Sequence, residues 1–158
     1  SITQAAFVQT LMKLMSKDEL LDRDFYMRGK KPKLDVRDKK LIFRRFLIEE
    51  KDYELTDLLW AYFSSVSNRW PKVWSTSDQG YMLAKTNGFM ALMRLLKDIY
   101  FDADNKMTLN EPYFDTIFAS MNFGDDEFTV ENHKPGSSGA GTLYNKFKES
   151  YYSSKDLE

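Results

Sequence analysis

The chain has 158 residues, a net charge of −1 and no cysteine, and 42% of its residues are hydrophobic. This length fits one domain, and the lack of cysteine excludes disulfides, thiolate metal sites and cysteine nucleophiles. Because the whole chain is nearly neutral, an electrostatic partner must be recognised by a local patch. No apolar run approaches the roughly 20 residues of a membrane span and no signal peptide is visible, so we expect a cytoplasmic protein.

Two short helical segments are expected near the N-terminus. Ser1 and Gln4 form a capping-box pattern, and apolar residues follow at helical spacing up to about Met15. Ser16 and Glu19 repeat the capping pattern, which predicts a second short helix or a turn. Four residues are expected to anchor that second segment: Leu20, Leu21, Phe25 and Tyr26.

A cluster of basic residues follows, at positions 28–45. It contains nine lysines and arginines, opposed only by Asp35 and Asp38. Gly29 and Pro32 interrupt regular structure, which predicts a loop up to residue 40. Such a cluster can neutralise DNA phosphates and release counterions, whereas the alternative is a loop whose charges simply keep it in water. The candidate nucleic-acid contacts are Arg28, Lys30, Lys31, Lys33, Arg37, Lys39, Lys40, Arg44 and Arg45.

The end of this segment is ambiguous. Residues 41–48 are apolar around Arg44 and Arg45, and the run is too short to separate a helix from a strand. We favour a helix because the neighbouring segments are helical. As an alternative to DNA contact, one of the two arginines is expected to pair with Glu49 or Asp52.

Two long helices are expected in the middle of the chain. Residues 51–70 follow the three-and-four spacing closely, and Pro71 is expected to stop that helix. Residues 85–102 carry an apolar stripe wider than one face, which predicts a central helix packed on two sides and capped by Thr86 or Asn87. Its predicted core residues are Phe89, Leu92, Met93, Leu95, Leu96, Ile99 and Tyr100.

Two more helices are expected after a loop at residues 102–110. Asn110 is predicted to cap the first of them, and Gly124 is predicted to end it. Residues 133–142 form the one low-complexity stretch, and a last helix follows it. The expected inward-facing residues of the two helices are Phe114, Ile117, Phe118, Met121, Leu143, Tyr144, Phe147 and Tyr151.

The glycine-rich stretch is a candidate anion site. Backbone N–H groups before a helix can converge on an anion, but the lysine of a nucleotide P-loop is missing, and the alternative is a flexible linker. Lys85 and Thr86 offer a cation and a helix N-terminus to the same kind of ligand; the alternative is an ordinary cap with a solvated lysine. The candidate anion-binding residues are Lys85, Thr86, Gly136, Ser137, Ser138, Gly139 and Gly141.

Other constellations are weak. His133 is the single histidine, and an exposed histidine in a polar loop seldom binds metal, even with Glu131 nearby. The calcium-like run that starts at Asp102 lacks the glycine and the glutamate that such a loop requires. Trp70 and Trp74 are expected to pack in the core or to form an aromatic corner. No catalytic constellation, metal site or cofactor is therefore expected.

The expected fold is a single, mainly α domain of five to seven helices, with a short strand pair allowed near Leu41 or Tyr81. The expected domain covers residues 1–156. Residues 157–158 are the Leu-Glu pair that an expression vector often leaves, and the chain is expected to be a piece of a longer protein.

Several stretches, in order, resemble the C-terminal helical region of DGQHR-domain proteins. The strongest match has a Lys-Thr-x-Gly-Phe core at Lys85, Thr86, Gly88 and Phe89. The matching stretches are ITQAAFVQTLMKLM, IFRRFLIEEKDYELTDLLWAYFSSVSNRWPKVW, MLAKTNGFMALMRLL and GSSGAGTLYNKF. This family includes DndB-type proteins, which are associated with DNA phosphorothioation and other DNA modification.

The family's Asp-Gly-Gln-His-Arg signature is absent, and Asp78-Gln79-Gly80 is not that motif. The resemblance implies that the signature lies in an N-terminal ParB-like portion outside this sequence. It therefore implies a non-catalytic helical domain of a DNA-binding or regulatory protein, with DNA as the expected partner of the basic residues. Two alternatives are a protein-interaction or oligomerisation domain without DNA contact, and a part of an enzyme that completes an N-terminal active site.

Overall fold

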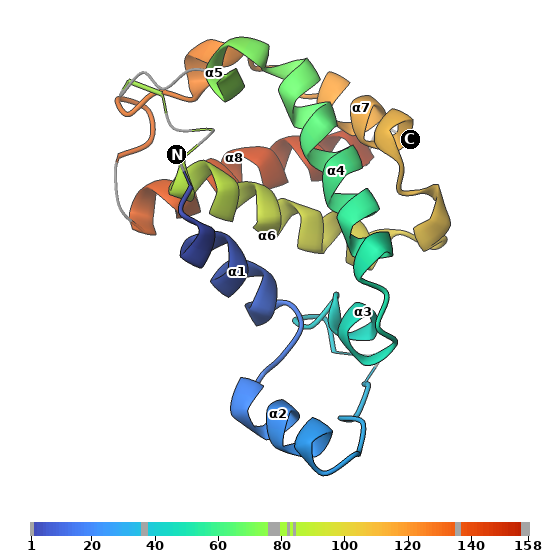
Figure 1. Ribbon diagram of the computed structural model, residues 1–158. Helices are drawn as coiled ribbons and strands as arrows, with labels where there is room; N and C mark the ends of the chain where they lie inside the picture. The colour runs from blue at the N-terminus through green and yellow to red at the C-terminus, as the bar shows by residue number, and fades with distance from the viewer. Residues whose placement is uncertain are drawn as a thin grey trace.

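The computed structural model describes residues 2–35, 38–75, 80, 81, 83, 85–134 and 137–155. These residues form a helical domain without a sheet, so the expected all-α class is confirmed (Figure 1). The one strand-like pairing among them is an isolated antiparallel bridge between Tyr81 and Thr129. That bridge lies at one of the two places where a short strand pair was expected.

Eight α-helices are found in the described residues, somewhat more than expected because two of them have only five residues. Two short 3-10 turns, at Lys106–Thr108 and Asp125–Glu127, complete the regular structure. The α-helices are α1 (Gln4–Lys13), α2 (Glu19–Met27), α3 (Arg44–Ile48), α4 (Asp52–Arg69), α5 (Pro71–Ser75), α6 (Thr86–Asp102), α7 (Glu111–Ala119) and α8 (Ser137–Lys155).

Helix α6 is the centre of the fold, as its wide apolar stripe predicts. It packs along α8 on one side, while α4 packs on α7 across the core (Figure 1). Phe89 is 2% exposed, and Leu92 and Leu96 are completely buried. Full burial of a large apolar side chain stabilises a fold by about 1.5–3 kcal/mol, so this helix contributes much of the core. All seven of the predicted core residues of α6 are buried.

The caps of the first helices differ from the expected ones. Thr3 caps α1, because its hydroxyl accepts a hydrogen bond from the Ala6 N–H at 3.1 Å, whereas Ser1 lies outside the described residues. Asp18 caps α2 by accepting from the Leu21 N–H at 3.0 Å. Ser16 is not a cap, because its hydroxyl donates to the carboxylate of Asp22.

The start of α6 also differs from the prediction. Lys85 occupies the N-cap position, so Thr86 is the first helical residue and not the cap, and Asn87 lies within the first turn. The backbone of Lys85 is extended, and its carbonyl accepts from the Phe89 N–H at 2.9 Å. The helix therefore begins without a side-chain cap and depends on burial of its apolar residues.

Helix α7 begins as predicted and ends early. Asn110 caps it by accepting from the Tyr113 N–H at 3.1 Å. The helix ends at Ala119 and not at Gly124, because the following carbonyls turn toward another partner. The guanidinium of Arg69 donates to the carbonyls of Phe118, Met121 and Phe123 at 3.1, 2.9 and 3.0 Å.

Trp70 packs in the core and Trp74 packs against it, but the two residues do not form one aromatic corner. Trp70 is completely buried and its ring stacks on Phe123, with a centroid separation of 5.7 Å. Trp74 is half-buried and stacks instead on Phe63, at 5.6 Å. Pro71 ends α4 as predicted, and it is also the first residue of α5.

Candidate nucleic-acid interface

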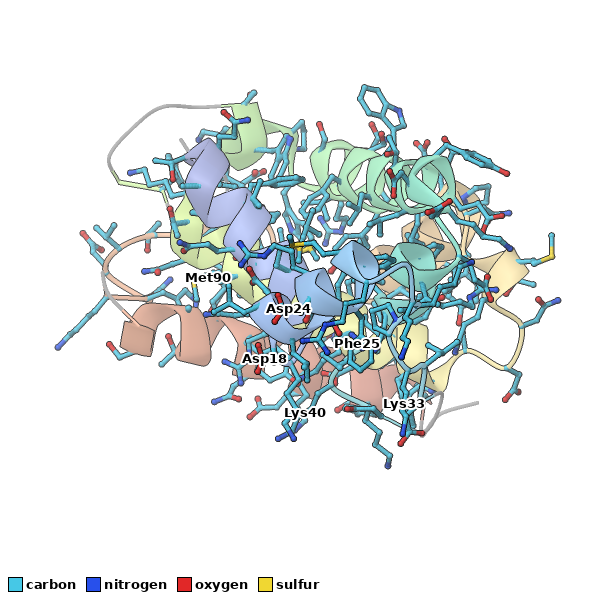
Figure 2. The ribbon with its side chains drawn as sticks, turned by 60° about the horizontal axis from the view of Figure 1, so that its bottom comes forward. Asp18, Asp24, Phe25, Lys33, Lys40 and Met90 are labelled. Carbon is cyan, nitrogen blue, oxygen red and sulfur yellow. The ribbon has the colours of Figure 1, made fainter. Side chains whose placement is uncertain are left out.

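Helix α2 and the basic segment, which comprises residues 28–45, project from the body of the domain at the bottom of Figure 1. Residues 28–35 contain no helix or strand, as predicted for a loop. Lys33 and Lys40 lie along the same edge of this projection (Figure 2). Of the predicted contacts, Arg37 lies outside the described residues. The exposed ones are Arg28, Lys30, Lys31, Lys33, Lys39 and Lys40.

Gly29 sets the direction in which this loop leaves α2. Its φ of +68° is in the left-handed region that favours glycine. The Gly29 N–H donates to the Tyr26 carbonyl at 3.0 Å, and the Lys30 N–H donates to the Phe25 carbonyl at 2.9 Å. These two bonds form a Schellman motif, which ends α2 and turns the lysines outward.

Arg44 is the anchor of the projection and not an exposed DNA contact. Its guanidinium donates two hydrogen bonds to the Asp22 carboxylate, at 2.8 and 2.9 Å, and the two side chains are only 11% and 10% exposed. A third bond reaches the Met15 carbonyl at 2.9 Å, and Nε donates to the Lys33 carbonyl at 2.6 Å. Arg44 therefore joins the body, α2 and the basic loop at one point.

Arg44 is not the one of the two arginines that makes the expected carboxylate pair. Neither Glu49 nor Asp52 pairs with it, because its side chain points back toward α2 and meets Asp22. The hydrogen bond from Arg44 is the main reason that the pKa of Asp22 is lowered from its ordinary value of 3.8, and burial opposes this effect. The bond to Asp22 likewise raises the pKa of Arg44. Both groups are therefore charged at neutral pH.

Arg45 has a different environment, although it is the next residue. Its side chain is 40% exposed and pairs with Glu49 at 4.0 Å, as one of the sequence alternatives expected. Its guanidinium also lies 5.5 Å from the ring centre of Phe46. Lys39 similarly lies over the ring of Phe101, at 4.9 Å. These two cations therefore have intramolecular contacts that any phosphate must compete with.

The candidate anion site near the C-terminus is not a loop. Helix α8 already begins at Ser137, so Ser138, Gly139 and Gly141 are helical residues, while Gly136 lies outside the described residues. The extra turns form because Ala140 is buried and continues the apolar stripe of α8 upstream. The Tyr144 hydroxyl on α8 donates a hydrogen bond to the Asp98 carboxylate on α6. The N-termini of these two helices lie at the same end of the domain (Figure 1).

His133 is buried, contrary to the expectation of an exposed loop residue. It is 4% exposed, its Nδ1 lies 3.0 Å from the Thr142 hydroxyl, and its Nε2 lies 3.2 Å from Glu127. Glu131, the neighbour considered from sequence, does not take part in these contacts. The ring therefore links the 3-10 turn at residues 125–127 to the first turns of α8. Among the described residues, no group of histidines and carboxylates could hold a metal ion.

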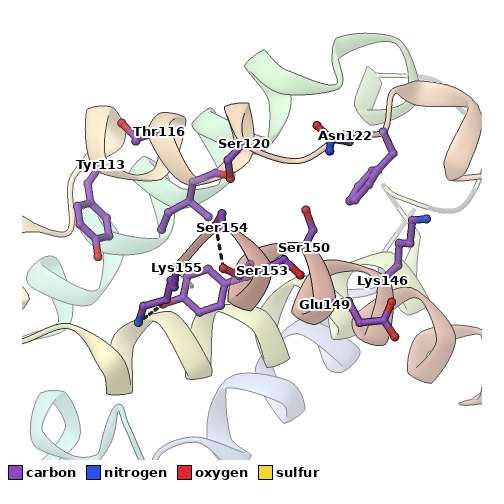
Figure 3. A pocket seen from close by; sticks show the side chains of 13 residues that line it. Tyr113, Thr116, Ser120, Asn122, Lys146, Glu149, Ser150, Ser153, Ser154 and Lys155 are labelled. Carbon is purple, nitrogen blue, oxygen red and sulfur yellow. Dashed lines mark hydrogen bonds between the residues drawn. The ribbon is translucent and has the colours of Figure 1, made fainter. Parts of the chain in front are cut away.

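A groove of about 790 Å³ separates α7 from α8 (Figure 3). Ser150, Ser153 and Ser154 present hydroxyls along α8, and Lys146 and Lys155 lie at opposite ends. Lys155 is engaged by Asp102 at 3.4 Å and by the Tyr151 hydroxyl at 3.4 Å. Burial and the adjacent Asp102 raise the pKa of the Tyr151 phenol, so it stays protonated at neutral pH. Sequence reasoning missed this groove because only the packing of α7 creates it.

No protein-family model, no curated protein and no solved structure matches this sequence. No helix among the described residues is long and apolar enough to cross a membrane. Any assignment of function to this domain therefore rests on the geometry of the described residues. It separates Arg44, a buried anchor, from a set of exposed cations on one projecting segment.

Proposed function

We propose that this domain binds the phosphate backbone of DNA through its basic segment, as a non-catalytic part of a DNA-modification-associated protein. The observation that carries the proposal is the exposure of five cations on one projecting segment, whose side chains form no ion pair or ring contact with the other described residues. These residues are Arg28, Lys30, Lys31, Lys33 and Lys40. Association with a DNA-modification system rests on the resemblance to the DGQHR family alone.

Charge density supports phosphate binding rather than base recognition. Lysines bind phosphates as point charges, and each phosphate neutralised releases condensed counterions. Such contacts position a protein on DNA without reading its sequence. The basic segment contains nine cations against two carboxylates in a chain whose net charge is −1, so the positive charge is concentrated locally.

Arg44 supports the proposal as a positioning residue. Its bond to the Lys33 carbonyl at 2.6 Å fixes the loop backbone, and its pair with Asp22 fixes α2 beneath that loop. A loop that is held before binding loses less conformational freedom when it contacts DNA. The buried arginine thus serves the exposed lysines without touching DNA.

The test replaces Lys30, Lys31 and Lys33 together by glutamine and measures binding to a fluorescently labelled duplex by anisotropy at low salt. We expect affinity to fall by about tenfold or more, because three phosphate contacts are lost. The matched control replaces three exposed lysines on other parts of the domain, Lys13, Lys134 and Lys148, which changes the net charge equally. Equal losses in the two triple variants, or no binding by the native chain, would refute the proposal.

A further inference from the structure

One face of α4 lines a groove that runs between it and helices α1 and α5. The residues of α4 that line this groove recur at three-and-four spacing from one end of the helix to the other, so they form a continuous stripe. The opposite face, which includes Tyr62 and Val66, is buried in the core. The stripe comprises Asp52, Leu55, Thr56, Leu59, Trp60, Phe63, Ser64, Ser67 and Asn68.

The groove beside this stripe has a volume of about 710 Å³ and an aromatic floor. Phe7 of α1 and Trp74 of α5 form its other walls. Phe89 of the central helix lies beneath, with its ring 5.3 Å from that of Phe7 and 5.6 Å from that of Phe63. Since these rings pack on one another and on α6, the groove has a preformed shape.

Trp60 projects beside this groove and is 75% exposed. A tryptophan so exposed leaves a large apolar surface in water, and tryptophan is a residue that dominates the energetics of protein interfaces. The same face therefore carries both an apolar projection and an apolar hollow. A surface with both features can pair with itself, as a two-fold interface requires.

We propose that this face binds a second copy of the chain, with the two α4 helices antiparallel about Trp60. Trp60 lies midway in the stripe between Asp52 and Asn68, so a two-fold axis near it makes the whole stripe self-complementary. Each Trp60 then enters the groove of the partner copy. The proposal uses none of the basic residues and does not depend on DNA binding.

The charges of the stripe fit an antiparallel pair. Asp52 is the one charged side chain among the described residues that line the groove. In an antiparallel pair about Trp60, Asp52 lies opposite Asn68, and Thr56 lies opposite Ser64. A parallel pair would instead place the two Asp52 carboxylates opposite each other, which like-charge repulsion disfavours.

The first experiment measures molar mass by sedimentation equilibrium from micromolar to near-millimolar concentration. We expect the native chain to form a dimer reversibly and W60A to dissociate at least about tenfold more readily. The matched control is Y53A, since Tyr53 is 69% exposed on the same helix and does not line the groove. Circular dichroism checks that both variants keep their helices.

The second experiment uses the lack of cysteine to test the register directly. Chains carrying T56C are mixed with chains carrying S64C under mild oxidation, and each single variant is oxidised alone. We expect the mixture to yield a crosslinked dimer much faster than either single variant. A monomer at all concentrations, a dimer unchanged by W60A, or equal crosslinking in all three samples would overturn the proposal. A monomer that instead binds a synthetic amphipathic helical peptide would also overturn it, and would reassign the groove to another protein.

Discussion

The guanidinium of Arg44 makes four hydrogen bonds in a nearly buried position, and this makes it the most consequential charged side chain of the projection. We predict that R44A lowers the free energy of unfolding by about 3 kcal/mol, because it leaves the buried Asp22 carboxylate without an opposite charge. R45A, a matched change at the half-exposed neighbour, is expected to cost at most about 1 kcal/mol. Urea unfolding followed by circular dichroism measures both values, and equal costs would contradict the assignment.

Asp22 makes this anchor sensitive to acid. Its pKa is lower in the folded chain than its ordinary value of 3.8, so the folded state binds fewer protons than the unfolded state. The ion pair therefore stabilises the fold fully above about pH 4, and this contribution is lost as pH falls through the folded-state pKa. We predict that the stability difference between the native chain and D22N narrows as pH falls from about 5 to about 2. A difference that stays constant over this range would be evidence against the pair.

The different roles of Arg44 and Arg45 were not predictable from sequence. The two residues are adjacent in the same apolar run, and their candidate partners were chosen because they are near in sequence. Asp22 is distant in the chain and comes close only because α2 folds back under α3. Local spacing predicted that one of the two arginines pairs with Glu49 or Asp52, and Arg45 does pair with Glu49 at the C-cap of the same helix. It did not predict the pair of Arg44 with Asp22, which depends on tertiary structure.

At the scale of elements, replacing either of two glycines by alanine is predicted to change stability in opposite directions. Gly141 lies inside α8, and a Cβ added there meets no atom within 4 Å, so G141A should raise stability by about 0.5–1 kcal/mol. Gly29 also has open space, but its φ of +68° is unfavourable for alanine, so G29A should cost about 1 kcal/mol. Thermal unfolding of the two variants gives the comparison. Destabilisation by G141A would indicate that the Gly-rich stretch is a loop after all.

The elements themselves were largely predictable, because long amphipathic patterns are independent of detailed packing. The spacing of apolar residues placed α4 and α6 within a residue of their observed bounds. The glycines before Leu143 suggested a loop because glycine weakens an isolated helix. Burial of Ala140 against the body overrides that weak local preference.

At the scale of the whole molecule, the projection and the two grooves arise from how helices pack. The wide stripe on α6 predicted that partners cover it on two sides, and α8 lies along it in the folded chain. The stripe of α4 that lines the groove, however, looks in the sequence like part of an ordinary amphipathic helix. Only the positions of α1 and α5 in the folded chain show that these helices leave Trp60 uncovered beside a groove.

The most direct test of the central claim is the salt dependence of duplex binding. The logarithm of the association constant should fall linearly with the logarithm of salt concentration, with a slope of about −0.9 for each phosphate neutralised. We predict that changing Lys30, Lys31 and Lys33 to glutamine reduces the magnitude of that slope by about 2 to 3, while the Lys13, Lys134 and Lys148 control leaves it unchanged. Identical slopes for the native chain and the first variant would contradict a phosphate contact through the basic segment.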